Sequence, residues 1–108
     1  MDPATSPLPD LILWRSDRCH LCEDTQELLD ALMRERAAAG RPLPRVVPRR
    51  IADHPEVQRA LFEQIPVLEV AGRRLPLAIR IGPVRAFLDE AYGAIIAADE
   101  AGPVGSSA

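Results

Sequence analysis

The chain has 108 residues and a formal net charge of −3, and 47% of its residues are hydrophobic. This length suits one domain with a modest core and leaves little room for a second. All thirteen basic residues are arginines spread along the chain, which argues against a nucleic-acid or membrane-surface role. No segment reaches the roughly 20 apolar residues that span a bilayer.

The first nine residues contain three prolines and no periodicity, so a disordered leader is expected over 1–9. This stretch lacks the basic start and apolar run of a secretory signal, and a cytoplasmic location is therefore expected. One domain is expected over residues 10–96, followed by a flexible tail over 97–108. Residues Asp10 to Trp14, with the apolar run Leu11-Ile12-Leu13-Trp14, predict a strand in the centre of a sheet.

Cys19 and Cys22 follow this strand and stand at the start of a helical pattern that runs from Leu21 to about Ala39. The free N–H groups and the dipole at a helix start favour a thiolate on the first cysteine, and the spacing lets the second sulfur reach it. Cys19 is therefore predicted to attack a disulfide and Cys22 to resolve the intermediate. In a reducing compartment such a pair is typical of catalysis, redox sensing or metal binding.

Three residues near the pair are candidates for tuning it. A protonated His20 would stabilise a thiolate on Cys19, although a residue at this position can also simply face solvent. Arg18 could stabilise the same thiolate or bind an anionic partner. Trp14, the sole tryptophan, is expected either to pack in the core or to serve as a platform for a substrate.

Helical spacing places Leu21 among the apolar positions of the first helix and Arg36 on its polar side, and Gly40 is expected to end the helix. Residues 45–51 predict a second strand. Pro48 lies within it and cannot donate to a ladder, so this strand is expected at a sheet edge.

The second helix is predicted to begin with Asp53 as its cap and Glu56 as the capping-box partner, and to end near Glu63. Residues 65–70 predict the third strand. Ala71-Gly72 is expected to connect it, as a hairpin, to a fourth strand over 73–81.

Pro76 makes the fourth strand a second candidate for a sheet edge. Gly82-Pro83 opens the last helix. The element order is strand, helix, strand, helix, strand, strand, helix. It predicts an α/β fold with a mixed four-stranded sheet and helices on both faces.

With these elements placed, the chain resembles the thioredoxin fold and, within it, the glutaredoxin-like branch, from about residue 10 to 92. Cys19-x-x-Cys22 after the first strand, Ile65-Pro66 before the third and the Val70 to Arg73 hairpin carry the resemblance. The Cys-His-Leu-Cys stretch resembles that of short bacterial glutaredoxin-like proteins.

The resemblance implies thiol–disulfide exchange on a protein or low-molecular-weight disulfide. We expect a monomer without cofactor or metal. It implies that Pro66 is cis and lies against the cysteines, and that the backbone of Ile65 or Val67 pairs with an extended substrate. Glutathione-using relatives carry a Gly-Gly-x-Asp stretch where this chain has Ile81-Gly82-Pro83-Val84. Glutathione is therefore a doubtful partner.

Two alternatives remain open at the level of sequence. The chain could be a redox-sensing or binding module that has kept the fold without turnover. It could also bind zinc or an iron–sulfur cluster across a dimer. A structural zinc takes four ligands, and the chain offers only Cys19, Cys22, His20 and His54.

Overall fold

The computed structural model describes residues 8–107, with side chains up to residue 96. A four-stranded sheet has the strand order β2-β1-β3-β4. β1 and β2 are parallel, whereas β3 pairs antiparallel with both β1 and β4. The predicted mixed sheet is confirmed. The strands are β1 (Leu11–Arg15), β2 (Val46–Arg50), β3 (Val67–Val70) and β4 (Arg73–Leu75).

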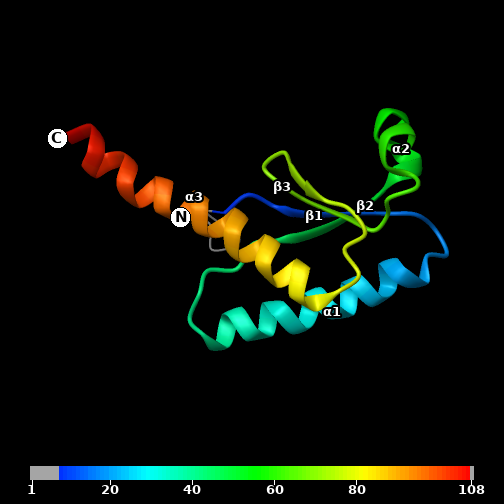
Figure 1. Ribbon diagram of the computed structural model, residues 1–108, viewed down its shortest axis with the longest axis horizontal. Coiled ribbons are helices and arrows are strands. Elements are labelled where there is room, and N and C mark those ends of the chain that lie inside the picture. Colours follow the sequence, from blue (N-terminus) through cyan, green and yellow to red (C-terminus); the bar gives the residue numbers. More distant parts are fainter. Residues whose placement is uncertain (1–7, 108) are drawn as a thin grey trace.

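The helices cover both faces of this sheet, as predicted, with α1 and α3 on one face and α2 on the other (Figure 1). Alternation along β1 explains the two layers, because successive side chains of a strand point to opposite faces. Leu11 and Leu13 pack in the α1–α3 core, whereas Ile12 and Trp14 pack on the α2 side. The helices are α1 (His20–Ala38), α2 (Pro55–Leu61), α3 (Ile81–Ser107) and a 3₁₀ turn, η1 (Ile51–Asp53).

β2 contains a proline and β4 ends directly before one, and both strands lie at the sheet edges, as predicted. Pro48 stands inside β2 and pairs with Leu13 in the register of β1. β4 ends at Leu75, immediately before Pro76, and so is much shorter than the expected 73–81. Residues 76–80 form an irregular connection instead. Proline cannot continue the ladder, and this explains the early end.

The predicted hairpin turn is confirmed. Val70 pairs with Arg73, so Ala71 and Gly72 are the two loop residues, and both have positive φ, 49° and 86°. Two consecutive left-handed residues define the mirror-image turn whose twist matches that of the flanking strands.

Gly40 ends α1, also as predicted. Its φ is 71°, its N–H donates to Ala37 O, and the N–H of Arg41 donates to Arg36 O. This pair of bonds is the Schellman arrangement, which satisfies carbonyls that the helix end leaves open.

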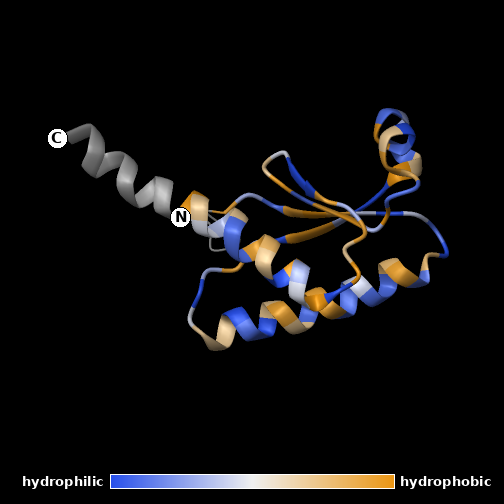
Figure 2. Ribbon diagram, viewed as in Figure 1, coloured by the Kyte–Doolittle hydropathy of each residue, from blue (hydrophilic) through white to orange (hydrophobic). Residues whose placement is uncertain are grey.

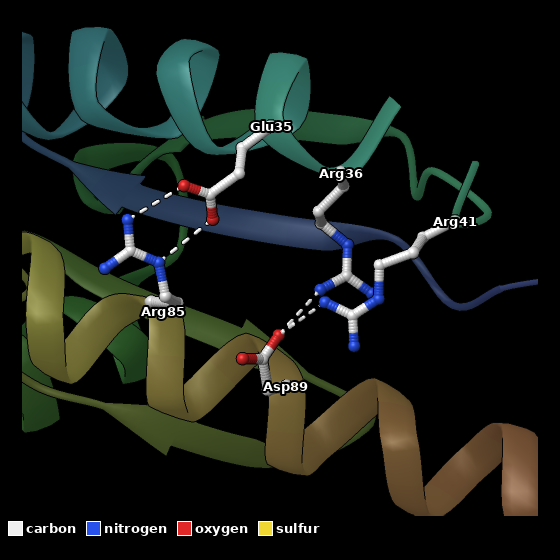
Figure 3. Close-up of polar contacts among 5 residues, drawn as sticks. All are labelled: Glu35, Arg36, Arg41, Arg85 and Asp89. Carbon is white, nitrogen blue, oxygen red and sulfur yellow. Dashed lines mark hydrogen bonds and ion pairs between the residues drawn. The ribbon is translucent and has the colours of Figure 1, made fainter. Parts of the chain in front are cut away.

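Arg36 was expected on the polar side of α1, and this prediction is wrong. Only 4% of the residue is exposed, because its guanidinium reaches across to α3 (Figure 3). The Nη1 of Arg36 donates a 3.1 Å hydrogen bond to the carboxylate of Asp89, and its guanidinium carbon lies 5.8 Å from the centre of the Tyr92 ring. Arg41 donates to the same carboxylate. The ion pair and the ring offset the cost of burying the charge.

One turn away, Arg85 of α3 makes two parallel hydrogen bonds of 2.9 Å to the carboxylate of Glu35 (Figure 3). A two-pronged contact of this kind fixes geometry as well as charge. The guanidinium beside it holds the pKa of Glu35 below its usual value. The two carboxylates therefore join α1 to α3 through ion pairs.

The start of α2 differs from the expected capping box. Asp53 ends the 3₁₀ turn, and the residue that precedes the helix is His54, whose side chain makes no cap hydrogen bond. The extra turn buries Ile51 against the α2-side cluster, and Pro55 then begins the helix at a position that suits proline. The helix ends at Leu61, slightly before the expected Glu63.

Two features at the chain ends also differ from expectation. Leu8 is buried in the α1–α3 core, and Pro9 O accepts a 3.0 Å hydrogen bond from the hydroxyl of Tyr92. The expected leader over 1–9 therefore does not extend to these residues, and residues 1–7 lie outside the described part.

At the other end, α3 continues to Ser107 and includes residues for which a tail was expected. The alanine-rich stretch 97–101 favours helix, whereas Gly102 and Pro103, which α3 also includes, do not.

Candidate active site

The two cysteines lie at the N-terminus of α1 and are joined by a disulfide, with their Cα atoms 5.2 Å apart. Arg18, with a φ of 56°, turns the chain after β1. Cys19 is then the N-cap of the helix, with extended backbone, and its Sγ accepts a 3.1 Å hydrogen bond from the N–H of Cys22. The sulfur therefore takes the place of the polar oxygen that usually caps a helix.

The two sulfurs differ in their access to solvent. Cys19 is partly exposed, whereas Cys22 is fully buried within the first turn of the helix. An incoming group can therefore meet the side chain of Cys19, while Cys22 stays behind it and within bonding distance. This asymmetry matches the predicted roles of attacking and resolving sulfur.

The Ile65–Pro66 peptide bond is cis, as the resemblance implied. Pro66 is buried and precedes β3, where Val67, also buried, pairs with Trp14 of β1. Ile65 is partly buried against the α2-side cluster. The N–H of Ala78 donates to Pro66 O at 2.9 Å, so the irregular segment after β4 lies directly beside this bend.

Thr25 connects the cysteine-bearing turn to the proline bend. Its hydroxyl lies 2.6 Å from Ala78 O and 2.9 Å from Leu21 O. A chain of contacts therefore runs from the first turn of α1 through Thr25 and Ala78 to Pro66. The structure thus brings the helix tip and the proline bend together, although they are more than 40 positions apart in the sequence.

Sequence reasoning did not single out Thr25. A signal was present, because the threonine stands three residues after Cys22 on the buried stripe that continues to Leu29 and Leu32. A polar side chain at such a position needs a hydrogen-bond partner when it is buried. The partner, Ala78 O, could not be identified from sequence, because it lies 53 residues away.

His20 and Arg18 both lie at the surface beside Cys19. The His20 side chain is 95% exposed, and its Nδ1 lies 3.9 Å from a carboxylate oxygen of Glu23. Arg18 is also exposed. Solvent screens charges in such positions. The predicted tuning of the thiolate by these two residues stays a prediction.

Trp14 is a packing residue. It is nearly fully buried, and its Nε1 donates to Glu69 at 3.1 Å. The ring meets His54 edge-on at 5.0 Å, and the Arg49 guanidinium lies 5.9 Å from its centre. No open ring face is left as a platform for a substrate, and the packing interpretation is the one that holds.

Glu69 occupies a partly buried position between Trp14 and Arg74. Desolvation by burial raises its pKa, but hydrogen bonds from Arg74, at 2.7 Å, and from Trp14 outweigh this, and the net pKa lies below its usual value. The carboxylate is therefore held in its charged form in the folded protein.

In the part of the chain that the structure describes, no group of three or more His, Cys, Asp or Glu side chains is arranged to hold a metal ion. Within the same residues, no helix is both long enough and apolar enough to cross a membrane.

The sheet order, the helices on both faces, the cysteine pair at the start of α1 and the cis bond before β3 define a thioredoxin-like α/β protein. Comparison with solved structures agrees. The chain is similar to Northeast Structural Genomics target protein XcR50 from X. campestris, with 30% identity and a TM-score of 0.59. The match covers 75% of this chain and 97% of the X. campestris chain. The chain belongs to the same family as that protein. No protein-family model and no curated protein matched.

Proposed function

We propose that the chain is a glutaredoxin-like thiol–disulfide oxidoreductase. One observation carries the proposal, namely that the partly exposed Cys19 caps α1 and forms a disulfide with the buried Cys22. In the reduced protein, the N–H that now donates to Cys19 Sγ would be available to a thiolate, and the helix dipole has the favourable sign.

The reaction needs no group beyond the two cysteines. The Cys19 thiolate attacks one sulfur of the substrate disulfide, forms a mixed disulfide and releases the first substrate thiolate. The Cys22 thiolate then attacks Cys19 Sγ, which releases the second substrate thiolate and closes the Cys19–Cys22 bond. The substrate gains two electrons and the cysteine pair loses two, so an external dithiol must reduce the pair before another cycle.

The proline bend would orient the partner. Backbone groups at Ile65 or Val67 would pair with an extended substrate, as the resemblance implies. The contacts from Thr25 through Ala78 to Pro66 support this role, because they hold the bend next to the helix that carries the cysteines. A reducing, cytoplasmic setting belongs to the same proposal, since it would keep the pair available for exchange.

Glutathione is not the partner that we favour. In relatives that use it, a glycine-rich helix start binds a carboxylate of the tripeptide. Here α3 begins Ile81-Gly82-Pro83, and Pro83 has no N–H to offer. A disulfide in a protein or in another small molecule is the preferred substrate.

Two single variants test the proposal. Cys19→Ser is expected to abolish the reduction of a small aromatic disulfide by the full chain, with a dithiol as electron donor. Cys22→Ser is expected to keep the attack but to accumulate a mixed disulfide at Cys19, visible as a mass increase. Turnover by Cys19→Ser at the wild-type rate would refute the assignment of the nucleophile.

The same experiment separates catalysis from redox sensing. A wild-type chain whose Cys19–Cys22 bond forms and breaks reversibly, but which reduces no disulfide at a rate above that of the free dithiol, would be a sensing or binding module instead. Both states of the pair can be followed by thiol labelling and mass spectrometry.

A further inference from the structure

An ion pair connects the turn that carries Cys19 to the end of the neighbouring strand. A carboxylate oxygen of Asp17 accepts a 2.8 Å hydrogen bond from Nη2 of Arg50. Arg15 and Arg50, the last residues of β1 and β2, are paired in the register of the sheet. The two strands therefore end at the same edge of the sheet, and Asp17 meets Arg50 just beyond β1.

Arg50 also contacts the segment that leads to α2. Its Nη1 lies 3.9 Å from a carboxylate oxygen of Asp53, the last residue of η1. One guanidinium therefore lies between two carboxylates, and these come from different segments of the chain. An isolated exposed ion pair contributes little to stability, whereas several charges in a network contribute more. This network joins the turn after β1 to the turn after β2.

The turn after β1 has a backbone conformation that would suit glycine. The φ of Arg18 is 56°, in the left-handed region, which is unfavourable for a residue with a Cβ atom. The next residue, Cys19, is extended, with φ −105° and ψ 105°, and its sulfur caps α1. The position of Cys19 Sγ therefore depends on a turn that its own sequence does not favour.

Apolar packing does not hold this turn in place. Its three residues are Ser16, Asp17 and Arg18, none of which is apolar. Figure 2 shows hydrophilic residues both in the turn and at the end of β2. Asp17 and Arg18 are also exposed. The ion pair between Asp17 and Arg50 is therefore the contact that ties the turn to the sheet.

We propose that Arg50 is a positioning residue for Cys19. By binding Asp17 it fixes the turn, so that Cys19 Sγ stays within reach of the N–H of Cys22. The inference rests on the proposed function, because it takes Cys19 as the attacking sulfur. The helix N–H groups and the dipole stabilise a thiolate at this place, and they do so only while the turn keeps the sulfur there.

The reactivity of Cys19 in the reduced, full-length chain tests this role. Iodoacetamide labels thiolates, and fragmentation of the labelled peptide in a mass spectrometer shows which cysteine carries the label. In Arg50→Gln, labelling of Cys19 is expected to be about 2- to 5-fold slower than in the wild type, the factor that loss of an exposed ion pair gives. Arg50→Lys keeps the charge and should recover most of the wild-type rate.

Arg45→Gln is the matched control. Arg45 makes two hydrogen bonds to Asp10, of 2.9 and 3.3 Å, and this pair joins the residues that precede the same two strands. The five residues of β1, about 17 Å of strand, separate the pair from the turn that carries Cys19. Arg45→Gln therefore loses a similar ion pair and should keep the wild-type rate at Cys19. Urea unfolding of both variants measures any loss of stability, which by itself would leave the labelling rate of the folded chain unchanged.

Asp17→Asn separates the position of the turn from its charge. A carboxylate near Cys19 disfavours the thiolate, so its removal would speed labelling if charge alone mattered. If Arg50 acts by fixing the turn through Asp17, Asp17→Asn should slow labelling instead. The double variant Asp17→Asn/Arg50→Gln should then be no slower than the slower of the two single variants, because both remove the same contact.

Three results would overturn the inference while the oxidoreductase function stands. They are an unchanged rate in Arg50→Gln, an equal loss of rate in Arg45→Gln, and faster labelling in Asp17→Asn. Labelling of Cys22 in preference to Cys19 in the wild type would instead overturn the assignment of the attacking sulfur, and this inference with it.

Discussion

Replacing Thr25 by valine tests the connection between the cysteine-bearing helix and the proline bend. Valine has nearly the shape of threonine, so the change removes the hydroxyl without opening a cavity. Ala78 O would lose its 2.6 Å hydrogen bond inside the protein. An unsatisfied buried carbonyl costs about 1 to 3 kcal/mol, and we expect the free energy of unfolding to fall by about 2 kcal/mol.

Thr25→Ser is the matched control, because it keeps the hydroxyl and loses one buried methyl group, at a cost of about 1 kcal/mol. Urea unfolding followed by the fluorescence of the single, buried Trp14 measures both variants. If the proposed function is right, Thr25→Val should also lower kcat/KM on a disulfide more than Thr25→Ser does. A valine variant within about 0.5 kcal/mol of the wild type would refute the energetic role assigned to the hydroxyl.

Two other contacts lead to predictions of stability. Tyr92→Phe should lower the free energy of unfolding by about 1 kcal/mol, because the hydroxyl of Tyr92 donates to Pro9 O; an unchanged urea midpoint would contradict this. Glu69 has a pKa below its ordinary value of 4.5 and therefore contributes stability above that pH, which is lost as pH falls through the folded-state pKa. Glu69→Gln should consequently lose less stability than the wild type between about pH 6 and about pH 3, and equal losses in urea unfolding would exclude this contribution.

Features that depend on near neighbours in the chain could be predicted from sequence. The cysteine pair at the start of α1, the Gly40 helix end and the turn at Ala71-Gly72 each follow from local backbone chemistry. The edge position of β2, which contains Pro48, and of β4, which ends before Pro76, has the same origin, because a missing N–H is a property of the residue itself.

Predictions from periodicity failed where the same residue suits either of two local structures, such as a buried or an exposed helix position. Leu21 was expected among the apolar positions of α1, but 46% of it is exposed beside the cysteines. Asp53 had the spacing of a helix cap, but a 3₁₀ turn that buries Ile51 includes it instead. In both places the exposure or the local structure of the residue depends on a neighbouring element, which the repeat of apolar residues does not reveal.

The sequence by itself determined the order of the elements, the mixed sheet and the pair of sulfurs at a helix start, because periodicity, proline and glycine act over a few residues. The tertiary structure alone decided the burial of Arg36 by Asp89 and the path from Thr25 through Ala78 to the proline bend. Each of these contacts joins residues 53 positions apart. Their partners become known only when folding brings α1, α3 and the segment after β4 together.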